Sequence, residues 1–147
     1  MIKIATSQEL RVRDVMSTEV LTIPFSATVE AAARLLHDAR VSGAPVVGPS
    51  GRVLGVVSTK DLLNPQRSLA PDASVADVMT RVVFAVRADD ALKWAIRLMV
   101  EERIHRVVVA DDAGHLVGIV SAMDVLAALV PAGEPDDVSF SYVDLRS

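Results

Sequence analysis

The sequence predicts an α/β protein of the mixed α+β kind, in which two β-α-β-β-α repeats pack around a pseudo-twofold axis. Two observations support this fold class. Residues 12–63 align without a gap with residues 75–126, and both copies close on a similar heptapeptide, GVVSTKD at 55–61 and GIVSAMD at 118–124. A gapless match of this length indicates a duplicated unit. Because one unit alone would expose the apolar face of its strands, we expect two units to cover each other.

The duplication divides the chain into five segments. The joining stretch NPQRSLAPDAS is polar and contains prolines, as a linker does. In the tail, Val138, Phe140 and Tyr142 alternate with polar residues, so that a short strand and a disordered end are both compatible with it. The segments are an N-terminal segment 1–11, repeat 1 at 12–63, the linker 64–74, repeat 2 at 75–129 and the tail 130–147.

Each repeat opens with a short apolar stretch, 20–23 or 82–86, that we predict to be its first strand. A helix follows. In repeat 2, Leu92, Ala95, Ile96 and Met99 recur at the spacing of one helical face. Ser26 and Asp89 are the expected N-caps. Arg40 and Arg103 stand near the helix ends, where the helix dipole favours a cation.

Two β-rich runs then flank the turns PSG and DAG, which predicts a hairpin in each repeat. A second helix is expected to start near Lys60 in repeat 1 and near Met123 in repeat 2. The order β-α-β-β-α therefore occurs twice.

Composition argues against several classes of function. The formal net charge is −4 and the basic residues are scattered, so we expect no nucleic-acid binding. The longest apolar run, VLAALV at 125–130, is far shorter than the roughly 20 residues of a membrane span. The first residues lack the apolar core of an export signal, and we expect a cytoplasmic protein.

Catalysis and metal binding are also not expected. The chain has no cysteine, and neither His37 nor His115 has a partner at ligand spacing. No nucleophile elbow, phosphate loop or pair of catalytic acids is visible. We therefore predict a protein that is not an enzyme and holds no metal.

The repeated S-x-x-D of the two heptapeptides has two interpretations. It matches a capping box, in which the serine hydroxyl accepts a helix N–H and the acid reaches back to the serine N–H. It also lies where a strand meets a helix, a usual place for ligands, and the preceding glycine would let another group approach the backbone. A carboxylate there would accept hydrogen bonds from a ribose diol, each worth roughly 1.5–3 kcal/mol.

The doubled unit, with DVM at 14–16 and 77–79, APVVG at 44–48 and both terminal acids, resembles a tandem pair of CBS domains, the Bateman module. This resemblance implies a regulatory module that binds AMP, ADP, ATP or S-adenosylmethionine in two clefts between the repeats. It also implies a homodimer and an effector protein as partners.

The resemblance further implies which residues line the clefts. The terminal acids would bond the ribose with help from the serines, and the His105–Arg106 pair would hold the phosphates of both clefts, because repeat 1 has Ser42 and Gly43 at those positions. The first cleft, which we expect to be the better one, contains Leu21, Val41, Ser42, His105, Arg106, Ser121 and Asp124. The second contains Ser58, Asp61, Val83, Phe84, Ile104, His105 and Arg106, and bulkier side chains line it.

Two alternatives to a nucleotide sensor remain open at this point: a dimerisation scaffold with empty clefts, and a module for S-adenosylmethionine. Trp94 is expected in the core. We hypothesise that its side of the helix, shared with Ala91 and Leu98, contributes to a homodimer.

Overall fold

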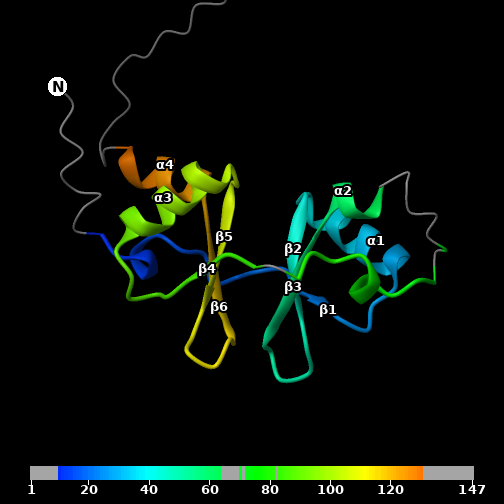
Figure 1. The fold of residues 1–147 in the computed structure, drawn as a ribbon. Helices are drawn as coiled ribbons and strands as arrows, with labels where there is room; N and C mark the ends of the chain where they lie inside the picture. Colours follow the sequence, from blue (N-terminus) through cyan, green and yellow to red (C-terminus); the bar gives the residue numbers. More distant parts are fainter. Residues whose placement is uncertain (1–9, 64–69, 71, 82, 131–147) are drawn as a thin grey trace, which may run out of the picture.

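The computed structural model of the chain describes residues 10–63, 70, 72–81 and 83–130. It confirms the predicted order of elements in both repeats, which lie side by side with their sheets toward the middle and most of their helices outward (Figure 1). Repeat 1 contains β1 (Ile23–Pro24), α1 (Val29–Ala39), β2 (Gly43–Val47), β3 (Val53–Ser58) and α2 (Thr59–Leu62). Repeat 2 contains β4 (Ala85–Val86), α3 (Leu92–Glu102), β5 (Arg106–Ala110), β6 (Leu116–Ser121) and α4 (Ala122–Leu129).

The two sheets have the same topology, with strand orders β1-β2-β3 and β4-β5-β6. The first strand of each sheet pairs in parallel with the second, and the second pairs antiparallel with the third. The strands β1 and β4 are shorter than the predicted stretches 20–23 and 82–86, because parallel pairing covers only two residues in each. Residue 82 lies outside the described residues, as do most of the linker and nearly all of the tail with its possible strand at 138–142.

The tips of the two hairpins meet across the repeats. Gly51 and Gly114 have positive φ values of 86° and 84°, which L side chains adopt with strain. Val53 N donates to the Gly114 carbonyl at 3.0 Å, and Leu116 N donates to the Gly51 carbonyl at 3.2 Å. In the second tip, Asp111 accepts backbone N–H groups, chiefly that of His115, and this lowers the pKa of its carboxyl.

A short segment ahead of each first strand crosses to the other repeat. These segments contain the 3₁₀ turns η2 (Val12–Asp14) and η3 (Val75–Asp77). Ser17 and Ile119 exchange backbone hydrogen bonds of 2.8 and 2.9 Å, and Thr80 and Val56 do the same at 2.8 and 2.9 Å. The crossing segments therefore pair residues 10–17 with repeat 2 and residues 73–80 with repeat 1.

The expected N-caps were wrong for both long helices. Thr28, not Ser26, caps α1 by accepting the Ala31 N–H at 3.1 Å. In α3 the N-cap is Ala91, which has no capping side chain. The crossing segments explain how α3 starts without one, because Leu92 N donates to the Leu10 carbonyl at 2.8 Å and so satisfies one orphan N–H.

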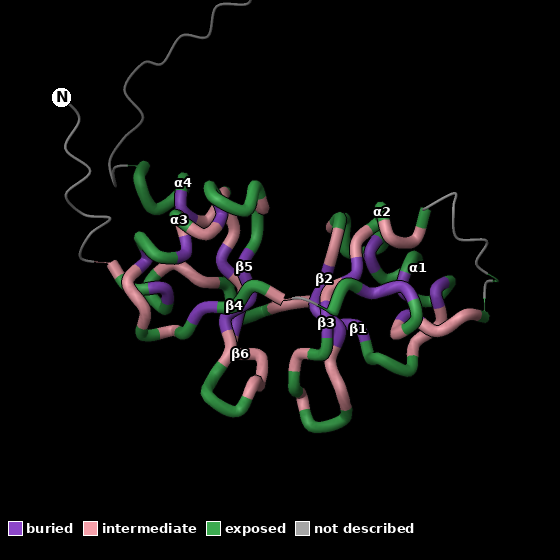
Figure 2. Tube along the Cα trace, viewed as in Figure 1, coloured by how far each residue is buried: buried purple, intermediate pink, exposed green. Residues whose placement is uncertain are grey.

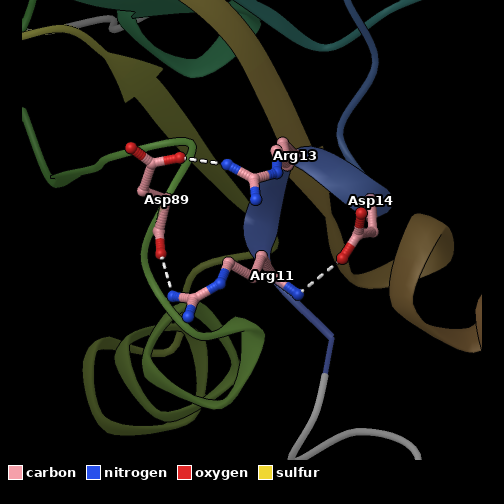
Figure 3. Close-up of polar contacts among 4 residues, drawn as sticks. All are labelled: Arg11, Arg13, Asp14 and Asp89. Atoms are coloured by element: carbon pink, nitrogen blue, oxygen red, sulfur yellow. Dashed lines mark hydrogen bonds and ion pairs between the residues drawn. The ribbon is translucent and has the colours of Figure 1, made fainter.

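Asp89 instead holds the first crossing segment. Its carboxylate forms an ion pair with Arg13, and its carbonyl accepts a hydrogen bond of 2.6 Å from Arg11 (Figure 3). Asp14 completes the cluster by accepting the Arg11 backbone N–H at 2.8 Å. The acid that resembled a helix cap is thus part of the contact between the repeats.

Each repeat has its own buried core between its sheet and its helices (Figure 2). The crossing segments contribute to the core of the opposite repeat: Val12 belongs to the second core, and Val75, Val78 and Met79 belong to the first. The expectation that Trp94 lies in the core was wrong. Its face of α3 is turned outward, and 51% of the residue is exposed. Among the described residues, no helix has the length and apolar character needed to cross a membrane.

Candidate functional site

Both S-x-x-D sequences form complete capping boxes, which confirms that interpretation of the motif. In the first box, Ser58 N donates to Asp61 Oδ2 at 2.9 Å and Asp61 N donates to Ser58 Oγ at 3.4 Å. In the second, Ser121 N donates to Asp124 Oδ2 at 2.9 Å and Asp124 N donates to Ser121 Oγ at 3.0 Å. Each carboxylate thus uses Oδ2 for the cap.

The capping bonds leave the other carboxylate oxygen available. Within the described part of the chain, Oδ1 of Asp61 and Oδ1 of Asp124 accept no hydrogen bond and make no ion pair. Both aspartates are half-buried. A carboxylate held by one oxygen and open at the other is oriented to accept a further donor.

The sequence suggested that the glycine ahead of each box makes room for an approaching ligand. The structure gives this glycine a different role. A Cβ on Gly55 would lie 2.7 Å from the Thr80 carbonyl oxygen, and one on Gly118 would lie 2.7 Å from the Ser17 carbonyl oxygen. The group that comes close to each glycine is therefore the backbone of a crossing segment, whose hydrogen bonds require that approach.

The starts of β2 and β5 hold the two boxes in place by matching contacts. Thr59 N donates to the Ser42 carbonyl at 2.9 Å, and Ala122 N donates to the His105 carbonyl at 2.8 Å. The next residue along each strand is the Cα partner of a box serine, with Gly43 opposite Ser58 and Arg106 opposite Ser121. Of the predicted residues, the structure thus brings His105, Arg106, Ser121 and Asp124 together in one cluster.

Arg106 also reaches the other repeat. Its Nη1 donates to the Gly43 carbonyl at 3.2 Å. Among the described residues of the predicted clefts, no other hydrogen bond joins the two repeats. Gly43 was not predicted as a site residue, because it acts through its carbonyl and its residue type gives no indication of that role.

The apolar residues predicted for the clefts lie on separate cores. Leu21 and Val41 pack against the first core and Ile104 against the second. Val83 is half-buried, and Phe84 is 37% exposed. A hollow of about 550 Å³ opens beside Val41 and Thr59, between α1 and α2. His37 and Arg40, which sequence analysis did not assign to a site, line it together with Ala33, Leu36, Leu62 and Leu63.

Fold and site together define a pseudosymmetric pair of β-α-β-β-α units with one acidic box per unit at the strand-to-helix junction. The model of the family described as "CBS domain" matches residues 12–66 and 75–131. The chain therefore belongs to the CBS domain family, and it is a CBS pair of the regulatory kind, as the resemblance predicted.

Two curated relatives are enzymes much longer than this chain. Homoserine O-acetyltransferase of Methanohalophilus mahii is 34% identical over 84% of this chain and 25% of its own length. Inosine-5'-monophosphate dehydrogenase of Halobacterium salinarum is 35% identical over 73% of this chain and 21% of its own length. The chain thus spans about a fifth to a quarter of these relatives.

Among solved structures, CBSX2 in complex with AMP is similar along nearly all of its length. It has 31% sequence identity and a TM-score of 0.72, and the match covers 80% of this chain and 94% of that one.

Proposed function

We propose that this CBS pair is a sensor that binds an adenine nucleotide between its repeats and transmits binding to a partner protein. The observation that carries the proposal is the second box. There Asp124 is oriented by its cap with Oδ1 open, and Arg106 starts the strand opposite Ser121. A carboxylate suits the ribose diol and a guanidinium suits a phosphate.

The first cleft would be formed by this cluster together with Leu21, Val41 and Ser42 from repeat 1. The contact from Arg106 to Gly43, next to Ser42, supports that pairing of strands. The second cleft would use Ser58 and Asp61 with Val83, Phe84 and Ile104, and it would share His105 and Arg106. The AMP complex of CBSX2 supports a nucleotide as the ligand.

Thermal unfolding in the presence of AMP, ADP, ATP, adenosine, adenine or S-adenosylmethionine tests the proposal. A ligand that binds only the folded chain raises stability by about 2.7 kcal/mol at 100 times its Kd. We expect a rise in Tm with the nucleotides. No response to any of these compounds would contradict the proposal, and a response to S-adenosylmethionine alone would reassign the ligand.

Asp124→Asn tests the role of the open carboxylate oxygen. Asparagine keeps an acceptor for the cap but removes the charge. We therefore expect the affinity for adenosine to fall by about tenfold, which reduces the rise in Tm. Free adenine has no diol, and its response should not change. Equal losses for adenosine and adenine would show that the carboxylate does not contact the ribose.

A dimerisation scaffold is the second candidate, and exposed apolar side chains favour it. Trp94 on α3 is 51% exposed, and Met123 and Leu126 on the adjacent α4 are 70% and 55% exposed. We expect the chain to form a homodimer through this surface. Light scattering should give a dimer mass for the unsubstituted chain and a monomer mass for Trp94→Glu, and an unchanged mass would remove Trp94 from the interface.

A further inference from the structure

Arg106 and Gly43 occupy equivalent positions of the duplicated unit, and they contact each other across the pseudo-twofold axis. Each is the first residue of the central strand of its sheet and the Cα partner of a box serine. The Cα of Arg106 therefore lies beside the second box. Its guanidinium, which donates to the Gly43 carbonyl at 3.2 Å, lies at the strand start beside the first box.

The reciprocal contact is not possible, because repeat 1 carries no side chain at that position. A Cβ on Gly43 would lie 3.1 Å from the Val57 carbonyl oxygen and 3.6 Å from Ser58 Cβ. Among the described residues at the two strand starts, one guanidinium thus serves two equivalent boxes. Lys60 on α2 is a cation two residues after Ser58, and Met123 replaces it in repeat 2.

The present partner of Arg106 is weak for a guanidinium. Arg106 forms no ion pair with any described residue. Its side chain is exposed and donates to one neutral carbonyl. An anionic oxygen is a stronger acceptor than a carbonyl, and a phosphate can take two guanidinium hydrogen bonds at once.

We propose that Arg106 couples the two clefts. The phosphate of a nucleotide bound at either box takes the same guanidinium away from the Gly43 carbonyl. The other cleft then lacks its cation. The chain therefore binds one phosphate-bearing nucleoside strongly and a second one weakly, while a neutral nucleoside fills the clefts without this penalty. This inference rests on the proposed nucleotide binding and adds its regulation.

Calorimetric titration of the full chain with AMP, and separately with adenosine, measures the ratio of the second to the first Kd. Adenosine has no phosphate, so its ratio measures the difference in affinity that comes from the different linings of the two clefts alone. We expect the AMP ratio to exceed the adenosine ratio by about tenfold or more, and Arg106→Gln to bring the two ratios together. Arg52→Gln, which removes an exposed cation at a hairpin tip between the repeats, should keep the AMP ratio unchanged.

The carbonyl ¹³C resonance of Gly43 gives a second measurement that does not depend on counting sites. One equivalent of AMP should shift this resonance in the same direction as Arg106→Gln does, because both remove the hydrogen bond. Adenosine should leave the arginine on the carbonyl and produce a smaller shift. An unmoved Gly43 resonance in the AMP complex would overturn the coupling.

Failure of the inference and failure of the proposed function give different results. If both compounds bind and the ratio of the second to the first Kd is the same for AMP as for adenosine, the coupling is overturned and the nucleotide sensor remains. If the AMP ratio fell to the adenosine ratio in Lys60→Gln but not in Arg106→Gln, the assignment to Arg106 would be overturned. Binding of neither compound would overturn the sensor and the coupling together.

Discussion

At the scale of single residues, Gly55 and Gly118 show how a repeated motif can have a structural cause. Each lies in the third strand of its sheet, where the backbone of a crossing segment approaches to within hydrogen-bonding distance. A side chain at either position would collide with a carbonyl oxygen that cannot move without breaking the pairing. The glycine in each heptapeptide is therefore explained by packing between the repeats.

Gly118→Ala should destabilise the chain by about 1–3 kcal/mol, because the new Cβ would lie 2.7 Å from the Ser17 carbonyl oxygen. Gly48→Ala is the matched control. Its Cβ would meet the flexible end of Leu54 at 3.3 Å, and we expect a change within about 0.5 kcal/mol. Urea denaturation measures both values, and equal effects of the two substitutions would contradict the packing explanation.

At the scale of elements, the helices α1 and α3 begin in different ways although they are equivalent. Thr28 caps α1 with its hydroxyl, while α3 begins at Ala91 without a side-chain cap. The equivalent backbone bonds are kept in both, since Val29 N donates to the Ala73 carbonyl at 2.7 Å and Leu92 N donates to the Leu10 carbonyl at 2.8 Å. The crossing segment is thus the common feature of both helix starts.

Thr28→Ala should lower the free energy of unfolding by about 1 kcal/mol, the usual effect of removing an N-cap hydroxyl. Ser26→Ala should change it by less than about 0.5 kcal/mol, because Ser26 is exposed and lies before the cap. Chemical denaturation of the two variants decides between the cap in the structure and the cap that the sequence suggested. The opposite ranking would restore Ser26 as the cap.

The sequence predicted the elements better than it predicted the contacts between them. The hairpins and helices follow from local periodicity and turn residues, and the capping boxes at Ser58 and Ser121 are local as well. The role of Asp89 could not be predicted, because its partners Arg11 and Arg13 lie 78 and 76 residues away in the chain. The contact from Arg106 to the Gly43 carbonyl escaped prediction for the same reason.

At the scale of the whole molecule, the crossing segments make the two repeats depend on each other. The first core is completed by Val75, Val78 and Met79 from the start of repeat 2, and the second core is completed by Val12 from the start of repeat 1. The hairpin tips add backbone hydrogen bonds across the same axis. The two repeats therefore complete each other's cores and share backbone hydrogen bonds.

Because of this exchange, we expect the two repeats to unfold together. Val75 is fully buried in the first core, and Val75→Ala should cost about 2 kcal/mol, or a factor of about 30 in the unfolding equilibrium. Native-state hydrogen exchange should then show the same loss of protection for the amides of Val46 in β2 and Val109 in β5. Val100→Ala, at an exposed valine of α3, should leave both amides unchanged. Loss of protection confined to Val46 would mean that the repeats unfold independently, and it would remove the structural basis for communication between the clefts.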